Sequence, residues 1–272
     1  MTVRYSGKAW DTHFLPRLSK LEVEAIPKET ALVVLPVGAT EQHGPHLPIF
    51  TDTLIGDGFI TATFNHLPDD ANIWLLPALP YGKSTEHMNH PGTITLSAQT
   101  LMAVLMDIAM SLKRSGFQKL AFYNTHGGNI DVLNMMGREI RIATGLAVFN
   151  LNTGSHNTSE GIITPEEKKA GIHGGDEETS IIMALKRDWV HDDLLPSELI
   201  NFPESTYLAF KNKTFAWIMD DVSVSGIGGD ATLATAEKGA ALIESGSKIL
   251  AEALLVFAAF DMKSLISLKV GR

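Results

Sequence analysis

Short apolar runs alternate with longer segments of helical period over the first 150 residues, and this alternation limits the fold more than any other feature of the chain. The apolar runs cover 31–38, 71–77, 119–124 and 145–150, and the helical segments between them cover 53–66, 97–116 and 129–143. Such an alternation predicts βαβ units with a mostly parallel sheet. Because the runs are apolar throughout, their strands should be buried on both faces. We therefore predict an α/β fold in which helices cover both faces of the sheet.

The rest of the chain is less regular. Residues 151–175 are rich in Gly, Ser, Thr and Asn and predict a loop, which a helix from Asp176 to Lys186 should follow. Residues 188–226 show no clear period, and Gly228–Asp230 should open a long helical segment. Its most apolar window, 248–260, is too short for a membrane span and predicts a buried helix. A length of 272 residues without a linker predicts a single domain over 1–272.

Charge and cysteine content exclude several kinds of site. The formal net charge is −9, whereas nucleic acids and anionic membranes require a basic surface, so we expect a small-molecule partner. The chain has no cysteine, which leaves histidines and carboxylates as the ligands of any metal. The N-terminus lacks the apolar core of a signal peptide, and we expect a cytoplasmic protein.

Histidines and carboxylates follow the first and third predicted strands. The stretch "PVGATEQHGPHLPIFTDT" (36–53) holds Glu41, His43, His46 and Asp52, and His126 follows the third run. Carboxyl ends of parallel strands share one edge of a sheet, so these groups should meet there. Carboxylate and imidazole together suit Zn²⁺, Mn²⁺ or Fe²⁺. Each residue also has an ordinary explanation: Asp52 as a helix N-cap, His126 as a turn histidine, and Glu41 with His43 as a solvated loop.

Two further polar loops add candidates. In "HGGDEETS" (173–180), Asp176 and Glu177 could simply favour the helix N-terminus, and Glu177 and Glu178 are equal candidates for a metal ligand. The loop 79–96 holds His87, a candidate for substrate contact or for support of a metal ligand. Four such loops at one sheet edge would form a pocket. Four histidines outside these loops are predicted to be surface or structural residues: His13, His66, His156 and His191.

Five segments of the chain resemble the signature segments of the creatininase (creatinine amidohydrolase) family. They are "GATEQHGPHLPIFTD", "YGKSTEHMNHPGTITL", "NTHGGN", "IHGGDEETS" and "GIGGDATLATAEKG", and they span 38–239 in the order of the family. The resemblance implies a three-layer α/β/α fold with a mostly parallel central sheet. It also implies a two-metal site that hydrolyses an amide-type C–N bond, in a homo-oligomer that is often a hexamer.

The resemblance also assigns roles to single residues. Two divalent ions, Zn, Mn or Fe, would bind: one to Glu41, Asp52 and His126, the other to His43, Asp52 and Glu178, with Asp52 bridging. Such a pair shares a water and supplies hydroxide at neutral pH. His173 matches the catalytic histidine of the family and would pass a proton to the leaving nitrogen. The backbone N–H groups of Gly127 and Gly128 are candidates for contacts with the substrate.

Two departures argue against creatinine as the substrate. Creatininase has a metal-binding glutamate two positions after the strand-end histidine, where this chain has Gly128, and Lys169 stands where an aromatic residue would stack on the creatinine ring. We therefore predict a metal-dependent amidohydrolase that cleaves another non-peptide or cyclic amide-type bond. The family alternatives are a formamidopyrimidine deformylase and a peptidase that trims a redox-cofactor precursor. Outside enzymatic hydrolysis, the alternatives are a catalytically silent metal-binding assembly protein and, from the "GIGGDA" turn, a nucleotide-binding enzyme.

Overall fold

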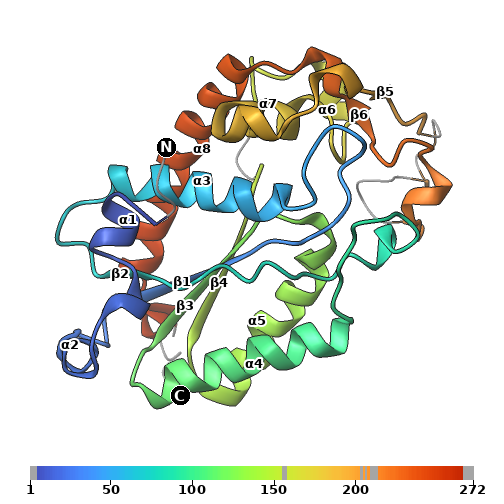
Figure 1. The fold of residues 1–272 in the computed structure, drawn as a ribbon. Helices are drawn as coiled ribbons and strands as arrows, with labels where there is room; N and C mark the ends of the chain where they lie inside the picture. Colours follow the sequence, from blue (N-terminus) through green and yellow to red (C-terminus); the bar gives the residue numbers. More distant parts are fainter. Residues whose placement is uncertain (1–4, 155–157, 203–204, 206, 209–213, 266–272) are drawn as a thin grey trace.

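A four-stranded parallel sheet forms the centre of the computed structural model, which describes residues 5–154, 158–202, 205, 207–208 and 214–265. The strands are β1 (Leu32–Val37), β2 (Ile73–Leu75), β3 (Lys119–Asn124) and β4 (Ala147–Asn152). They pair in the order β2-β1-β3-β4, with every pair parallel (Figure 1). A separate antiparallel pair joins β5 (Ser197–Glu198) to β6 (Gly229–Asp230).

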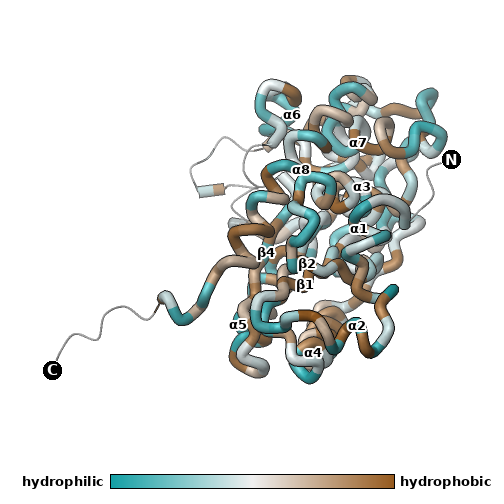
Figure 2. Tube along the Cα trace, turned by 90° about the vertical axis from the view of Figure 1, so that its left-hand side faces the viewer, coloured by the Kyte–Doolittle hydropathy of each residue, from teal (hydrophilic) through white to brown (hydrophobic). Residues whose placement is uncertain are grey.

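Helices pack on both faces of this sheet and produce the predicted three layers. On one face lie α1 (Lys8–Asp11), α3 (Thr51–His66), α7 (Asp176–Lys186) and α8 (Ala236–Ala259), and on the other lie α2 (Lys20–Ala25), α4 (Ala98–Arg114) and α5 (Ile130–Thr144). The short α6 (Pro165–Ala170) lies beside β6, near the start of α7 (Figure 1). Figure 2 shows both hydrophilic and hydrophobic residues along the outer helices, as expected of helices that bury one face.

The side chains of β1 explain why the sheet needs two helical layers. Leu32 and Val34 belong to the hydrophobic core under α3, α7 and α8, whereas Val33, Leu35 and Val37 belong to the core under α4 and α5. All six residues of the strand are buried. The continuous apolar run therefore reflects burial on both faces, as predicted.

The predicted strands and helices of the first 150 residues are all present, with ends shifted by a few residues. The predicted loop 151–175 is wrong in part, because it contains α6, whose N-cap Thr164 accepts a hydrogen bond from the N–H of Glu167. The long C-terminal helix begins at Ala236 rather than after Asp230, since Thr235 caps it. Its apolar window is not fully buried: Leu250 and Leu254 face the core, whereas Leu255 and Val256 are 37% and 63% exposed.

The register of the two central strands brings the site together. Val37 at the end of β1 pairs with Asn124 at the end of β3, so the segments that follow them start side by side. The segment after β1 leads into α3, and the segment after β3 carries His126. Within the described ranges, no helix has both the length and the apolar character that a membrane span requires.

Candidate metal centre

Asp52 lies at the centre of the site. The turn after β1 closes through the N–H of Glu41, which donates to the carbonyl of Ile49, and Gly44 takes a left-handed conformation (φ 71°) within it. Asp52 then falls on the second residue of α3, whose N-cap is Phe50, so the alternative explanation of Asp52 as an N-cap is wrong. One carboxylate oxygen of Asp52 lies 3.4 Å from His43 Nε2 and the other 3.4 Å from His126 Nδ1.

Hydrogen bonds hold both the backbone and the ring of His126. The Asn124 side chain donates to the His126 carbonyl (2.8 Å) and accepts from the His126 N–H (3.2 Å). The ring Nε2 donates to the carbonyl of Lys83 (3.0 Å), which leaves Nδ1 facing Glu41 Oε1 at 3.2 Å. His126 is therefore bonded to backbone, as the turn explanation supposed, and also aimed at two carboxylates.

His43 shows the same arrangement with its ring nitrogens exchanged. Nδ1 donates to the backbone carbonyl of Glu41 (3.0 Å), so Nε2 is the nitrogen that faces Asp52 at 3.4 Å and Glu178 at 3.7 Å, and it would bind a metal ion once its proton is lost. Histidines that bind metals typically donate the N–H of the ring nitrogen that is not a ligand to a backbone carbonyl, as His43 does here.

Within the described part of the chain, three groups of side chains have ligand atoms close enough to share one metal ion. They are Glu41 with Asp52 and His126, His43 with Asp52 and Glu178, and Glu41 with His43 and His173. The first two match the groups that the family resemblance implies, and they share Asp52. Four ligand atoms are buried without a hydrogen-bond partner among the described residues: both carboxylate oxygens of Glu41, His43 Nε2 and Asp52 Oδ2. Because buried polar atoms are rarely left without partners, these four atoms suit bound cations.

The charges of the site also favour cations. Among the described residues, the ion-pair partners of Glu41, Asp52 and Glu178 are all histidines. Burial lowers the pKa of His43, but Asp52 and Glu178 outweigh it and raise the pKa to about 10. Burial raises the pKa of Glu178 to about 7, against the opposing effect of His43. Without metal, buried carboxylates retain protons on their neighbours, and divalent ions would replace those protons.

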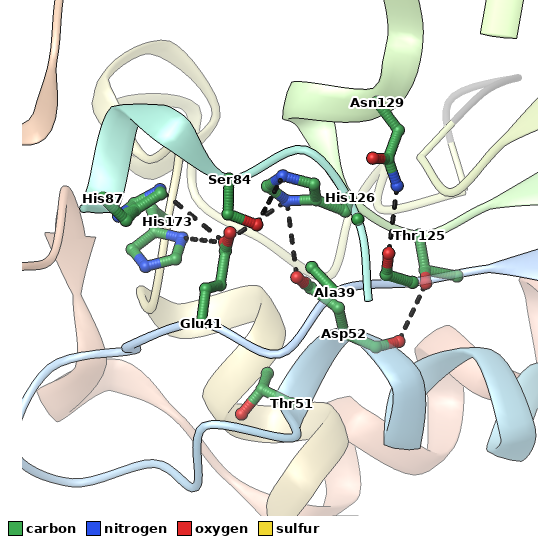
Figure 3. Close-up of polar contacts among 12 residues, drawn as sticks. Ala39, Glu41, Thr51, Asp52, Ser84, His87, Thr125, His126, Asn129 and His173 are labelled. Carbon is green, nitrogen blue, oxygen red and sulfur yellow. Dashed lines mark hydrogen bonds and ion pairs between the residues drawn. The ribbon is translucent and has the colours of Figure 1, made fainter. Parts of the chain in front are cut away.

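His173 lies between two other imidazoles. Its ring centroid is 4.1 Å from that of His43 and 4.2 Å from that of His87. Its Nε2 donates to the backbone carbonyl of Gln42 (2.7 Å), so Nδ1 faces Glu41 Oε1 at 3.6 Å (Figure 3). Burial, followed by the neighbouring His43 and His87, holds the pKa of His173 well below its usual value. The ring is thus neutral near pH 7, with a lone pair at Nδ1.

A cavity of about 320 Å³ opens beside this cluster, at the carboxyl ends of β3 and β4. Its polar lining includes Asn124, Asn152, Glu167, Lys168 and Glu177, besides His126, His173 and Glu178. Gly127 also lines it, whereas Gly128 and His87 do not. The predicted pocket is therefore present, but its walls come from the segment after β4, from α6 and from α7 rather than from the loop 79–96.

Gly128 is explained by close packing. A Cβ at this position would overlap the carboxylate of Glu86 and the carbonyl oxygen of Lys83. Glu86 lies on the outer side of His126, 3.7 Å from Nε2, and away from the ligand groups. The carboxylate that this position cannot supply is present nearby as Glu178, which supports the choice of Glu178 over Glu177. Glu177 lines the cavity but belongs to none of the three ligand groups among the described residues.

Several neighbouring residues are structural. Asp176 accepts from Ser180 (3.0 Å) and pairs with Lys238 (2.6 Å), and His46 contacts the hydroxyl of Thr179 (2.8 Å). Of the histidines predicted to lie outside the site, His13 is buried and contacts the carbonyl of Ile73. His66 pairs with Glu244 and His191 is exposed, whereas His156 lies outside the described residues.

Sequence reasoning missed the residues that hold the ligands in place. Gln42 lies between two predicted ligands and contacts both His87 and Gly226, yet the sequence contains no sign of this. Asn124 follows an apolar run and could have been noticed as a polar strand end. Glu167 and Lys168 belong to a helix that composition predicted as loop, so no signal placed them at the cavity.

The comparisons with known proteins agree on one family. The model "Creatininase: Creatinine amidohydrolase" matches residues 16–254. The chain is 31% identical over 211 residues to a mycofactocin precursor peptide peptidase of Mycolicibacterium smegmatis, covering 76% of this chain and 78% of the relative. It is 29% identical to a creatinine amidohydrolase of Pseudomonas putida, with 71% and 78% covered.

Solved structures support the same relationship. A putative creatinine amidohydrolase from Bacteroides fragilis superimposes with a TM-score of 0.77 at 26% identity, covering 94% of this chain and 99% of that one. Creatininase in a manganese form has a TM-score of 0.71, and a mutant creatininase in a Zn-Zn form has 0.70, each at 26% identity over 89% of this chain and 96% of the other.

Proposed function

The chain belongs to the creatininase family and is a hydrolase acting on C–N bonds, and from this premise we propose that it uses two metal ions to cleave a peptide bond in a short peptide. One observation carries the proposal: unpartnered ligand atoms of Glu41, His43 and Asp52 lie buried beside a cavity of about 320 Å³. Two divalent ions bound there would polarise a carbonyl group and lower the pKa of a water molecule towards neutrality.

The ligand residues divide between the two ions through Asp52. Glu41 and His126 would hold one ion, His43 and Glu178 the other, and Asp52 has an oxygen facing each group. The buried His, Glu and Asp groups resemble the site of a family with solved manganese and zinc forms, so we propose Mn²⁺ or Zn²⁺. Assembly into a homo-oligomer, which the family resemblance implies, stays a prediction.

His173 would move the proton. Its Nε2–H is held by the Gln42 carbonyl, which leaves Nδ1 as the atom able to accept a proton and deliver it to the leaving nitrogen. The pKa of His173 is low, so the ring is a base at neutral pH. The N–H of Gly127, at the cavity wall, would contact the substrate.

The cavity favours a peptide over a flat ring. Its described lining contains no Phe, Tyr or Trp, and Lys169 is exposed and does not line it. Its walls instead carry Asn, Thr and Ser side chains, which pair well with peptide N–H and C=O groups. With the peptidase named among the relatives, this supports the precursor-peptidase alternative over the non-peptide or cyclic bond first expected.

A direct substrate comparison tests the proposal. Purified protein loaded with Mn²⁺ or Zn²⁺ would be incubated with a mycofactocin precursor peptide, a scrambled peptide of the same composition, and creatinine. We expect cleavage of the precursor peptide, seen as new primary amine and as fragments by mass spectrometry, and little hydrolysis of creatinine. Creatinine turnover faster than that of the precursor peptide would contradict the proposal.

His173→Ala separates the role in proton transfer from metal binding. We expect the variant to retain its metals and to lose about 10²–10⁴-fold in kcat, the usual range for loss of a general acid or base. Metal loss from His173→Ala would instead identify His173 as a ligand, in the third of the three groups.

A further inference from the structure

The side-chain amide of Gln42 has only one allowed orientation. Its Oε1 accepts from the backbone N–H of Gly44 (2.9 Å), and its Nε2 donates to the backbone carbonyl of Gly226 (2.6 Å). Exchanging the oxygen and nitrogen would place a donor against an N–H and an acceptor against a carbonyl. Because both partners are backbone groups with fixed roles, the amide cannot turn over.

This orientation decides which nitrogen of His87 carries a proton. The second N–H of the Gln42 amide points to His87 Nδ1 at 2.9 Å, so Nδ1 accepts. The proton of the neutral ring then lies on Nε2, which is 3.6 Å from Glu41 Oε1 (Figure 3). His87 thus directs an N–H towards the Glu41 carboxylate and, at this distance, attracts it electrostatically without a hydrogen bond.

The other three imidazoles of the site differ from His87 in the hydrogen bond made by the ring nitrogen that faces away from the carboxylates. His43, His126 and His173 each donate one ring N–H to a backbone carbonyl, so the other ring nitrogen faces the carboxylates and can bind a metal ion when it is unprotonated. His173 Nδ1 and His87 Nε2 are both 3.6 Å from the same oxygen of Glu41. The two rings are therefore equally far from Glu41. They differ in the hydrogen bond made by the other ring nitrogen, which accepts in His87 and donates in His173.

We propose that Gln42 and His87 form a positioning pair that excludes His87 from the metals and uses its Nε2–H to hold the Glu41 carboxylate. His87 is 3% exposed and does not line the cavity, so it acts through Glu41 and not on the substrate. The inference rests on the two-metal site proposed above, because Glu41 needs orienting only if it is a ligand. Contacts that orient a metal ligand in this way typically contribute 10–100-fold to metal affinity.

The first test reads the proton directly. The full-length protein, labelled with ¹⁵N-histidine and loaded with Zn²⁺, would be examined by NMR, and His87→Gln would assign the His87 signals. We expect the proton on Nε2 and none on Nδ1. A proton on Nδ1, or a Zn²⁺-bound Nε2, would overturn the proposal.

Gln42→Glu reverses the hydrogen bond with little change of shape. A carboxylate accepts where the amide donated, so the His87 proton should move to Nδ1. An unchanged His87 tautomer in a folded variant would show that Gln42 does not set it. The wild-type spectrum decides the tautomer itself even if this variant folds poorly.

The last test measures Mn²⁺ affinity by calorimetry. His87→Leu removes the N–H and should weaken binding about 10–100-fold, whereas His87→Gln, which retains an N–H near the position of Nε2, should recover most of it. Equal affinity in wild type and both variants would overturn the positioning role. Absence of Mn²⁺ and Zn²⁺ binding in wild type would refute the two-metal site, while the tautomer of His87 would still be read from the unloaded protein.

Discussion

Glu41 and Glu167 are both buried glutamates near the same cavity, with exposed fractions of 1% and 4%, yet their surroundings differ. Each oxygen of Glu167 accepts a backbone N–H, one from Asp176 (2.9 Å) and one from Asp230 (2.8 Å). Among the residues that the structure describes, no donor lies within hydrogen-bond distance of either Glu41 oxygen, and the charged neighbours of Glu41 are imidazoles.

The difference separates a structural carboxylate from a ligand. Glu167 ties the start of α7 to β6, because each of its carboxylate oxygens accepts a backbone N–H. The Glu41 oxygens lie near the imidazoles of His126, His173 and His87 and have no backbone partner, so a bound cation or protons on these imidazoles must balance the buried charge. Burial alone therefore does not identify a functional carboxylate; the identity of its partners does.

Matched substitutions of the two glutamates should give opposite results. Glu41→Gln should lose metal and at least about 10³-fold in kcat/KM, or about 4 kcal/mol of transition-state stabilisation. Peptide hydrolysis, metal content and thermal unfolding provide the measurements.

Glu167→Gln is the matched control. Its amide can accept only one of the two backbone N–H groups, so we expect a loss of about 1–3 kcal/mol in unfolding free energy, with metals retained. Metal loss in Glu167→Gln together with metal retention in Glu41→Gln would reverse the assignment of the two residues.

Gly127 and Gly128, which directly follow His126, allow a second comparison of a tightly packed position with an open one. Gly128→Ala places a Cβ against Glu86 and the Lys83 carbonyl, and such overpacking should cost about 1–3 kcal/mol in unfolding free energy. A Cβ at Gly127 meets nothing within 4 Å, so Gly127→Ala should leave stability nearly unchanged and act only on KM. Denaturant unfolding of both variants measures this, and equal stability of the two would contradict the packing explanation.

Stability of the metal-depleted protein should fall as pH rises. The pKa of His43 is about 10 when folded and near 6.5 when unfolded, so its stabilising contribution is present below 6.5 and lost as pH rises through 10. One such group changes the unfolding free energy by at most about 1.4 kcal/mol per pH unit. Thermal unfolding between pH 7 and 10 should show the decline without metal and a flatter profile with it. If the stability of the metal-depleted protein did not change over this pH range, the raised pKa of His43 would be contradicted.

The fold was largely predictable because β1 and β3 are buried on both faces and their apolar runs are unbroken. Convergence of Glu41, Asp52 and His126 followed from parallel topology, which places the ends of β1 and β3 at one edge. The contacts of Gln42 with Gly226 and of Glu167 with Asp230 were not predictable, since these partners lie 184 and 63 residues away along the chain. Helix α6 was missed because its first turn depends on the cap at Thr164, within a segment of loop-like composition.

Metal content tests the central claim most directly, because both proposed ions share Asp52. Elemental analysis of the purified protein, after loading with Mn²⁺ or Zn²⁺ and removal of excess metal, should give two equivalents per chain. Asp52→Asn should lose both ions, while Glu167→Gln retains them. Well under one equivalent in wild type, or an Asp52→Asn variant with unchanged metal content, would contradict the two-metal site.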